Sequence, residues 1–218
     1  MCIISFFKQN DEVLLTHNRD ESIYRSASFD VEERFWEGNI YFSPVDYEKD
    51  GTWIFHSEDY IACILNGGKK KPVSIKSSYR RSRGLILLDL MKYNSAEEFC
   101  DTENLSAIAA FTIFVYHRKK NKIHFIFWDE TKLEINDLSD KNFVFRASST
   151  LYSSEKMRDL ENIFLKFNFS SSEDIFNLHH QIKMNDGEIE SGKATTSITQ
   201  IHAKAGKISM KYCPFLSK

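Results

Sequence analysis

The sequence is poor in the residues that divide a chain or crosslink it. Its 218 residues include 8 glycines, 3 prolines and 4 cysteines, and no Pro/Gly-rich or low-complexity segment separates one part from another. The cysteines show no Cys-x-x-Cys spacing, which argues against structural zinc and against a disulfide framework. A chain of this length with 42% hydrophobic residues can bury a substantial core. We therefore expect a single domain over residues 1–218.

Excess charge of one sign and long apolar runs are also missing. The formal net charge is −2, so no overall positive field favours nucleic acid as a partner. No stretch approaches the roughly 18 apolar residues of a membrane span, and the apolar run at the start is too short for a secretory signal. The histidines show no ligand spacing, so no metal and no cofactor is expected. The sequence thus predicts a soluble cytoplasmic protein, and it leaves the oligomeric state open.

What the sequence does have is a cysteine in second position. Removal of Met1, which normally follows when the second residue is small, would leave Cys2 with a free α-amine beside its thiol. Such a residue carries a nucleophile and a base together, because a thiol titrates near pH ~8.5 and an α-amine near pH ~8. A cysteine here can also pack as a small apolar side chain, so its surroundings decide between the two roles.

The next twenty residues have the pattern of a β-hairpin. Two apolar runs, over residues 3–7 and 13–16, flank a polar turn. A tight turn between them pairs Cys2 with Asn18 or Arg19 on the second strand. The hairpin therefore delivers the polar end of that strand to the amino terminus.

That polar end is the tetrapeptide Asn18-Arg19-Asp20-Glu21. Alternate residues of a strand point to opposite faces, so Asn18 and Asp20 would share one face and Arg19 and Glu21 the other. One pair can serve Cys2, but not all four. Asp20 would accept a hydrogen bond from the α-amine, whereas Arg19 would favour the thiolate by its charge. The pattern does not choose between Asp20 and Arg19.

Further short motifs accompany these residues in a fixed order, namely Met1–Ile4, Asn18–Glu21, Gly51–Trp53, Leu65–Gly67, Ser82–Gly84 and Ser148–Tyr152. In this combination the chain, from residue 1 to about residue 212, resembles the NRDE family, which includes the transport and Golgi organisation protein 2 homologues. The resemblance implies an α+β fold, a four-layer αββα sandwich similar to the N-terminal-nucleophile hydrolases, choloylglycine hydrolases and penicillin V acylases. It also links the chain to haem trafficking and acyl-CoA handling.

The resemblance further implies an oxyanion hole. Asn66 stands where the related acylases have an oxyanion-hole asparagine, and Gly67 lets the backbone approach closely, although Asn-Gly is also a common turn. The chain departs from the hydrolase pattern at two places. Serines, among them Ser149, replace a second asparagine, and Lys193 replaces a late arginine near residues 192–197. Ser149 could donate a hydrogen bond, and Lys193 could supply charge without the planar fork of arginine.

A basic segment offers a different use of the same pocket. Residues 69–83 hold seven positive charges, and no acidic residue follows until Asp89. Arg80, Arg81 and Arg83 could hold the phosphates of coenzyme A or the propionates of haem. A solvated loop would give the same pattern, and Arg83 could equally tie down the turn before a helix.

Two functions therefore remain open. The first is an N-terminal cysteine amidohydrolase that acts on a carbon–nitrogen amide, or an acyl thioester, of a small molecule, with Cys2, Arg19, Asp20 and Asn66 as catalytic residues. It requires removal of Met1. The alternative is a non-catalytic carrier of haem or acyl-CoA. In either case, the expected substrate- or anion-binding residues are Asn18, Gly67, Arg80, Arg81, Arg83, Ser149 and Lys193.

Periodicity gives a coarse map of the remaining elements. Strands are expected at residues 52–55, 60–65, 111–116, 122–128, 133–135, 143–145, 197–201 and 207–211. Helices are expected at 84–93, at 96–100 after a Ser95 cap, at 157–167 and from Ser172. Two sheets with helices packed against them would accommodate these elements.

Overall fold

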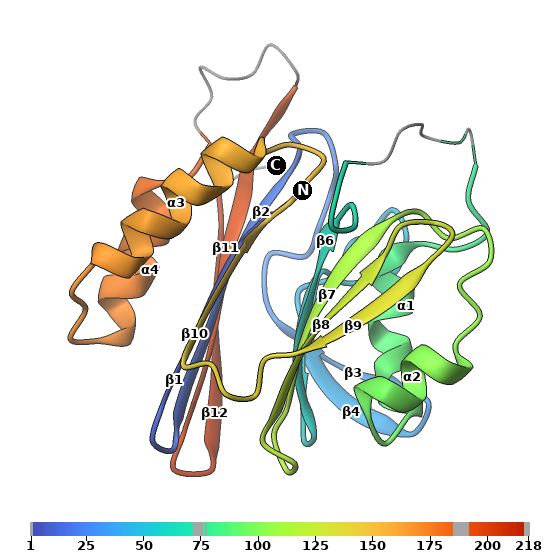
Figure 1. Ribbon diagram of the computed structural model, residues 1–218, viewed down its shortest axis with the longest axis horizontal. Coiled ribbons are helices and arrows are strands. Elements are labelled where there is room, and N and C mark those ends of the chain that lie inside the picture. Colours follow the sequence, from blue (N-terminus) through green and yellow to red (C-terminus); the bar gives the residue numbers. More distant parts are fainter. Residues whose placement is uncertain (1, 72–75, 77, 185–191, 216–218) are drawn as a thin grey trace. The chain divides into compact units, whose positions relative to one another are not determined.

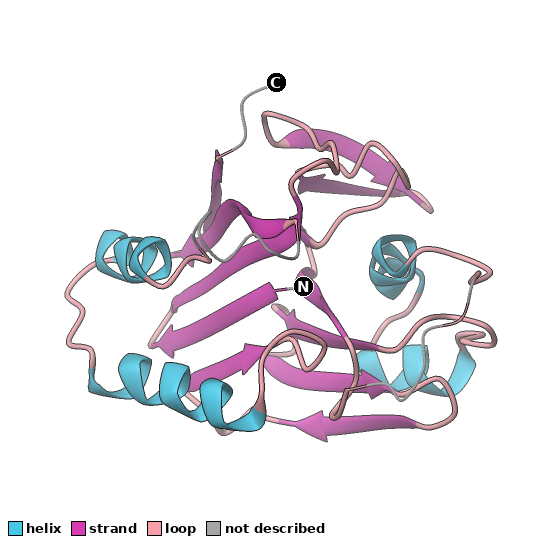
Figure 2. Ribbon diagram, turned by 90° about the horizontal axis from the view of Figure 1, so that it is seen from above, coloured by secondary structure: helices cyan, strands magenta, loops and turns pink. Residues whose placement is uncertain are grey.

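The computed structural model describes residues 2–71, 76, 78–184 and 192–215 (Figure 1). The chain divides into two compact units, one formed by Met1–Arg25 with Lys141–Lys218 and the other by Ser26–Asp140. Each unit has its own sheet and its own helices (Figure 2). The mixed α+β class predicted from the sequence is confirmed, and a single domain over residues 1–218 stays a prediction.

The first unit is built on a five-stranded antiparallel sheet. In spatial order its strands are β10 (Phe143–Ala147), β1 (Cys2–Gln9), β2 (Glu12–Ser22), β11 (Lys193–Lys204) and β12 (Lys207–Pro214). The predicted hairpin is β1 and β2, and Asn10 in its turn has a positive φ of 55°. Cys2 pairs with Arg19, which is one of the two partners expected from the turn.

Two helices of this unit pack beside that sheet (Figure 1). α3 (Ser154–Lys166) and α4 (Ser172–Gln181) begin at serine N-caps, and α4 has a full capping box. Apolar side chains of both helices meet one face of the sheet in a single buried cluster of Ile3, Phe145, Ala147, Leu160, Phe164 and Leu178. This face of the five-stranded sheet is called the helix face below.

The second unit is built on a seven-stranded antiparallel sheet. Its strands, in spatial order, are β3 (Glu32–Trp36), β4 (Asn39–Ser43), β5 (Ile54–Ser57), β6 (Tyr60–Asn66), β7 (Phe111–His117), β8 (Lys122–Trp128) and β9 (Leu133–Asp137). The sequence did not predict β3 and β4. β3 is the edge strand and β4 is its neighbour. Phe35 and Ile40 on these strands are exposed, so the two short segments lack the apolar and polar alternation of a half-buried strand.

The helical segments of the second unit are α1 (Arg83–Leu88), a 3-10 turn η1 (Asp89–Lys92) and α2 (Ala96–Thr102). The single helix expected at 84–93 is therefore wrong in its second half, where the tighter 3-10 turn follows α1 directly. The predicted Ser95 cap of α2 is confirmed. None of the helices in the described ranges is long and apolar enough to cross a membrane.

Two of the short sequence motifs meet at the start of α1. A Cβ atom on Gly84 would lie 2.6 Å from the backbone oxygen of Thr52, and one on Gly51 would lie 2.8 Å from the backbone of Gly84. The chain segments can approach this closely only because both residues lack a side chain. Gly51–Trp53 and Ser82–Gly84 therefore have a packing role in the fold.

Candidate functional site

Cys2 and Arg19 form the centre of the candidate site. They are directly opposite each other on β1 and β2, so their side chains project to the same face of the sheet. The residues of the helix face, such as Ile3, alternate with them along the strands, which places Cys2 and Arg19 on the opposite face. This is called the Cys2 face below. Both residues are nearly excluded from water, with exposed fractions of 3% and 4%.

Asp20 projects to the helix face, opposite to Cys2 and Arg19. Strand β2 stays extended through Ser22, so Arg19 and Asp20 diverge as the alternation predicts. The Asp20 carboxylate accepts hydrogen bonds from the Tyr152 hydroxyl at 2.8 Å and from Thr195 Oγ1 at 2.6 Å. The role of Asp20 beside Cys2 stays a prediction.

A β-bulge lies next to Arg19. The register of β11 on β2 shifts between Thr195 and Ser197, which leaves Thr196 as the extra residue. Thr196 Oγ1 accepts a hydrogen bond from Arg19 Nη1 at 3.2 Å and donates one to the Arg19 carbonyl at 3.1 Å. The bulge therefore fixes both the backbone and the guanidinium of Arg19 beside the Cys2 strand.

Burial dominates the acidity of the Cys2 thiol. Loss of solvation raises its pKa above the ordinary value, and the carboxylates of Asp20 and Glu21 raise it further. Arg19 acts in the opposite direction, as the sequence predicted, but burial outweighs it. The thiol is therefore protonated at neutral pH and needs a base to become a nucleophile.

The turn after β10 also reaches the start of β1. The Ser148 amide donates a hydrogen bond to the Cys2 carbonyl at 2.8 Å, and Ser149 is buried in the same turn. Lys193 begins β11 opposite Ser22, at the end of β2 that carries the tetrapeptide. The structure thus brings Ser149 and Lys193 into the same unit as Cys2, and their contacts with a substrate stay predictions.

The helix face behind Cys2 carries a fully buried polar network, called the clamp below, formed by Ser5, Asn18 and His179. Asn18 Oδ1 accepts a hydrogen bond from His179 Nδ1 at 2.7 Å, and Asn18 Nδ2 donates to the His179 carbonyl at 3.0 Å. Because Nδ1 is the donor, the neutral imidazole accepts at Nε2, where Ser5 Oγ lies at 2.8 Å. Burial lowers the pKa of His179 to about 3. The clamp joins β1 and β2 to α4.

The predicted oxyanion-hole residues belong to the second unit. Asn66 ends β6, and Gly67 follows it with a φ of 87°, which suits glycine. The Gly67 amide donates to the Ala110 carbonyl at 2.9 Å, and its own carbonyl accepts from Thr112 Oγ1 at 2.8 Å. These bonds hold the turn, and the oxyanion role of Asn66 stays a prediction.

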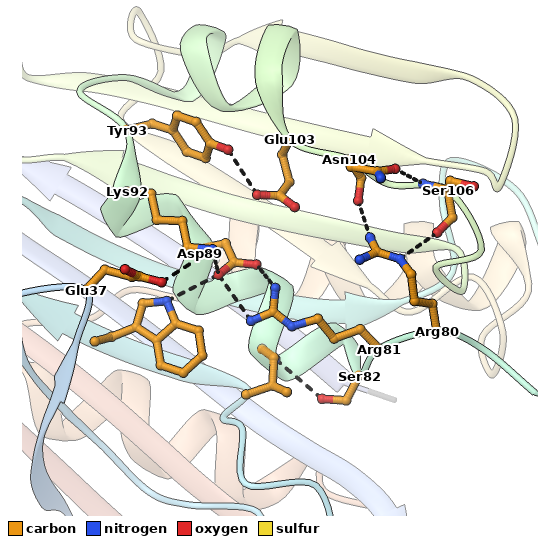
Figure 3. Close-up of polar contacts among 12 residues, drawn as sticks. Glu37, Arg80, Arg81, Ser82, Asp89, Lys92, Tyr93, Glu103, Asn104 and Ser106 are labelled. Carbon is orange, nitrogen blue, oxygen red and sulfur yellow. Dashed lines mark hydrogen bonds and ion pairs between the residues drawn. The ribbon is translucent and has the colours of Figure 1, made fainter.

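Arg80 and Arg83 are bound to backbone carbonyls of the second unit. Arg80 donates to the carbonyls of Asn104 and Ser106 (Figure 3), and Arg83 Nη1 donates to the Ala110 carbonyl at 3.1 Å. Guanidinium groups in such contacts fix neighbouring loops. For Arg83 this is the turn-holding role that the sequence left open beside anion binding.

Arg81 is paired with a buried carboxylate. Asp89 has no exposed surface, and both of its carboxylate oxygens bind Arg81 (Figure 3). Trp36 Nε1 donates to the same carboxylate at 3.2 Å, and Lys92 Nζ lies 2.9 Å from it. Two cations and an indole thus compensate the charge of Asp89 within the second unit, and loss of one partner would leave a buried charge uncompensated.

Two more cations of the basic segment also have acidic partners. Lys69 pairs with Glu134, and Lys76 lies 3.1 Å from Glu130. The sequence suggested an uncompensated positive run because these carboxylates lie about fifty or more residues further along the chain. Folding therefore neutralises much of the charge that could hold an anionic ligand.

Some site neighbours were not predicted. Tyr152 and Thr195 bind Asp20, Thr196 binds Arg19, and Glu21 lies on the Cys2 face by alternation. Tyr152 and Glu21 stood inside the recognised motifs, whereas the threonines are revealed only by the pairing of β11 with β2. Within the described part of the chain, no group of three or more histidine, cysteine or acidic residues could hold a metal.

Comparison with protein families decides where the chain belongs. The family model for Transport and Golgi organisation 2 matches residues 1–207. The chain is a member of this family. The match covers nearly the whole sequence and confirms the resemblance carried by the short motifs. A search of curated proteins found no match to the sequence of this chain.

Solved structures agree on the fold. A C2A mutant of the conjugated bile acid hydrolase from Clostridium perfringens matches with a TM-score of 0.56 and 10% identity, covering 100% of this chain and 97% of that one. The penicillin V acylase from Agrobacterium tumefaciens matches with a TM-score of 0.56 and 7% identity, covering 98% and 86%. The fold is therefore similar to the N-terminal-nucleophile hydrolases, and the two sheets and their helices are consistent with an αββα sandwich.

Proposed function

We propose that the protein is an N-terminal cysteine hydrolase that acts on a carbon–nitrogen amide, or an acyl thioester, of a small molecule. The observation that carries this proposal is the direct pairing of Cys2 with Arg19 on one face of a sheet, in a fold similar to amide hydrolases. The proposal keeps the cytoplasmic location expected from the sequence.

The proposed reaction begins with removal of Met1, which lies outside the described residues. The freed α-amine of Cys2 takes the thiol proton as the sulfur attacks the carbonyl carbon. The carbon–nitrogen bond of an amide, or the carbon–sulfur bond of a thioester, then breaks, the leaving nitrogen or sulfur takes the proton, and a thioester to Cys2 remains. Water hydrolyses the thioester and restores the thiol. Asp20 would orient the α-amine, and Asn66 with the Gly67 turn would stabilise the oxyanion.

The raised pKa of Cys2 supports this division of roles. A buried thiol that stays protonated at neutral pH is shielded from base in the solvent. An amine of the same residue is therefore the effective proton acceptor. Arg19 is held by Thr196 where its charge favours the developing thiolate.

The carrier hypothesis receives less support. It rested on the basic segment, but Lys69, Lys76 and Arg81 pair with carboxylates, while Arg80 and Arg83 bind carbonyls. Binding of acyl-CoA or haem would have to compete with these internal contacts. We therefore propose hydrolysis as the function of the site.

The test uses protein produced without any added residue at its amino end. Its intact mass should show loss of Met1, and brief incubation with a panel of medium-chain thioesters should leave an acyl group on the Cys2 peptide. The matched control is Cys100→Ser, because burial raises the pKa of Cys100 to about 12 and the proposed chemistry does not involve it. Retention of Met1 on protein that turns over substrate would contradict the proposal, as would acylation elsewhere than Cys2.

A further inference from the structure

The Cys2 face continues past Arg19 onto the neighbouring strand β11. Ser197 pairs with Arg19, so Cys2, Arg19 and Ser197 form one row across three strands. Thr199 pairs with His17 in the next row of the same face. Arg19, Ser197 and Thr199 thus lie in two adjacent rows of this face, and we call these three residues the polar row. The short motifs of the sequence contain neither of its hydroxyl residues.

The two hydroxyl groups of the polar row are unsatisfied. Ser197 and Thr199 have exposed fractions of 1% and 0%, and neither hydroxyl has a hydrogen-bond partner within the part of the chain that the structure describes. A buried hydroxyl without a partner loses its hydrogen bonds to water and gains none in return, so such groups are rare in folded proteins. Two of them on adjacent rows beside a proposed nucleophile call for a ligand that completes their bonding.

The position of the polar row indicates which part of a substrate it would meet. Neighbouring strands lie about 4.8 Å apart, which puts Ser197 about 10 Å from Cys2 across the sheet. This is too far for contact with the oxygen of the attacked carbonyl. It is within reach of a group several bonds away from the reacting carbon, with Arg19 between the two.

The donors of the polar row favour a ligand that carries an acidic group. Arg19 supplies a planar cationic donor, and the two hydroxyls supply neutral donors in a region excluded from water. Along β1 the same face carries the fully buried Ile4 and Phe6, and Arg146 of β10 is paired with Ile4 on this face. The face therefore combines hydrocarbon along β1 with the donors of the polar row, and it also carries the side chains of Glu21 and Arg146.

We propose that Ser197 and Thr199 bind, together with Arg19, an acidic group of the substrate and thereby select substrates that carry one. The proposal rests on the proposed function for the position of the reacting carbon. The binding itself does not require the thiol, so it can be tested without catalysis.

The test measures binding of two probes to the Cys2→Ala protein by calorimetry. The probes are 3-(butanoylamino)benzoate, which carries a carboxylate, and butanoyl anilide, which is its neutral counterpart. We expect the carboxylate probe to bind at least tenfold more tightly. Ser197→Ala and Thr199→Val should each weaken it by about tenfold, or about 1.4 kcal/mol, and change the neutral probe less than twofold, because only the charged probe makes the charge-assisted hydrogen bond.

Ser43→Ala is the matched control. Ser43 on β4 is also a buried serine whose hydroxyl has no partner among the described residues, but it belongs to the second unit. This substitution should leave the binding of both probes unchanged. Equal binding of the two probes, absence of binding, or equal losses in Ser43→Ala and Ser197→Ala would overturn the proposal.

These outcomes are separate from those for the hydrolase. Selective binding of the carboxylate probe without any acyl transfer to Cys2 would support the polar row and contradict hydrolysis. Acyl transfer to Cys2 that is indifferent to Ser197 and Thr199 would support hydrolysis and overturn the polar row.

Discussion

The two faces of the five-stranded sheet differ in whether their buried polar side chains are hydrogen-bonded. On the helix face, the clamp of Ser5, Asn18 and His179 satisfies its side chains with one another. On the Cys2 face, the hydroxyls of Ser197 and Thr199 have no partner among the described residues. A completed network stabilises the native state by itself, whereas an incomplete one lowers stability until a ligand supplies the missing partner. The comparison favours a structural role for the clamp and ligand binding for the polar row.

The largest expected effect is on activity, at Cys2. Cys2→Ala should reduce hydrolysis at least 10³-fold, equivalent to about 4 kcal/mol of barrier, because the nucleophile is removed. Its free energy of unfolding should change by about 1 kcal/mol or less, since a small buried side chain is replaced by a slightly smaller one. Turnover and urea unfolding of the same preparation measure the two. A large loss of stability would make Cys2 a core residue and weaken the comparison.

Disruption of the clamp should instead have a large effect on stability. Asn18→Leu leaves His179 Nδ1 and its carbonyl without partners in the core, so the free energy of unfolding should fall by about 2–4 kcal/mol. Urea unfolding of the variant against the wild type measures the loss.

A triple variant, Ser5→Ala with Asn18→Leu and His179→Leu, sharpens this result. It removes the side-chain groups of the clamp together and should lose less stability than the sum of the three single changes. Additive losses would show that the three residues do not act as one network.

The acid stability of the protein should report the clamp as well. His179 titrates near pH 6.5 when unfolded and near 3 when folded, so between these values the unfolded state binds more protons. The contribution of neutral His179 is complete above about pH 6.5 and is lost as the pH falls towards 3, at about 1 kcal/mol per pH unit. His56, whose pKa is lowered to about 4 by burial, acts in the same window.

The measurement is therefore the difference between wild type and His179→Leu. Urea unfolding at several pH values should show a shallower dependence in the variant, with the remaining slope due to His56 and the other titrating groups. Parallel profiles would mean that His179 is not buried in its neutral form.

The helix face and the Cys2 face also differ in how far the sequence predicts them. The pairing of Cys2 with Arg19 follows from a two-residue period and a tight turn, both of which are local. The row beyond it depends on β11, whose residue 197 pairs with residue 19 across most of the chain, and no local pattern encodes that register. The bulge at Thr196 adds a shift that alternation cannot anticipate.

His179 illustrates the same limit on the helix side. In sequence, His179 and His180 are adjacent histidines on a predicted helix, and nothing distinguishes them. In the structure His179 is buried in the clamp while His180 is exposed, because packing of α4 on the sheet turns one of them inward. The short strands β3 and β4 were not predicted because their exposed apolar residues obscure the usual two-residue period.

The smallest expected effect compares two serines on the two faces. Ser5→Ala removes the donor to His179 Nε2 and should lower the free energy of unfolding by about 1 kcal/mol, since a buried acceptor loses its partner. Ser197→Ala removes a hydroxyl that has no partner among the described residues, so it should leave stability unchanged or raise it by up to about 1 kcal/mol. Both are buried strand residues of the same sheet, and each change removes one oxygen. Urea unfolding of both variants in parallel decides the point: if Ser197→Ala loses as much stability as Ser5→Ala, the hydroxyl on the Cys2 face has a structural partner and the contrast between the faces disappears.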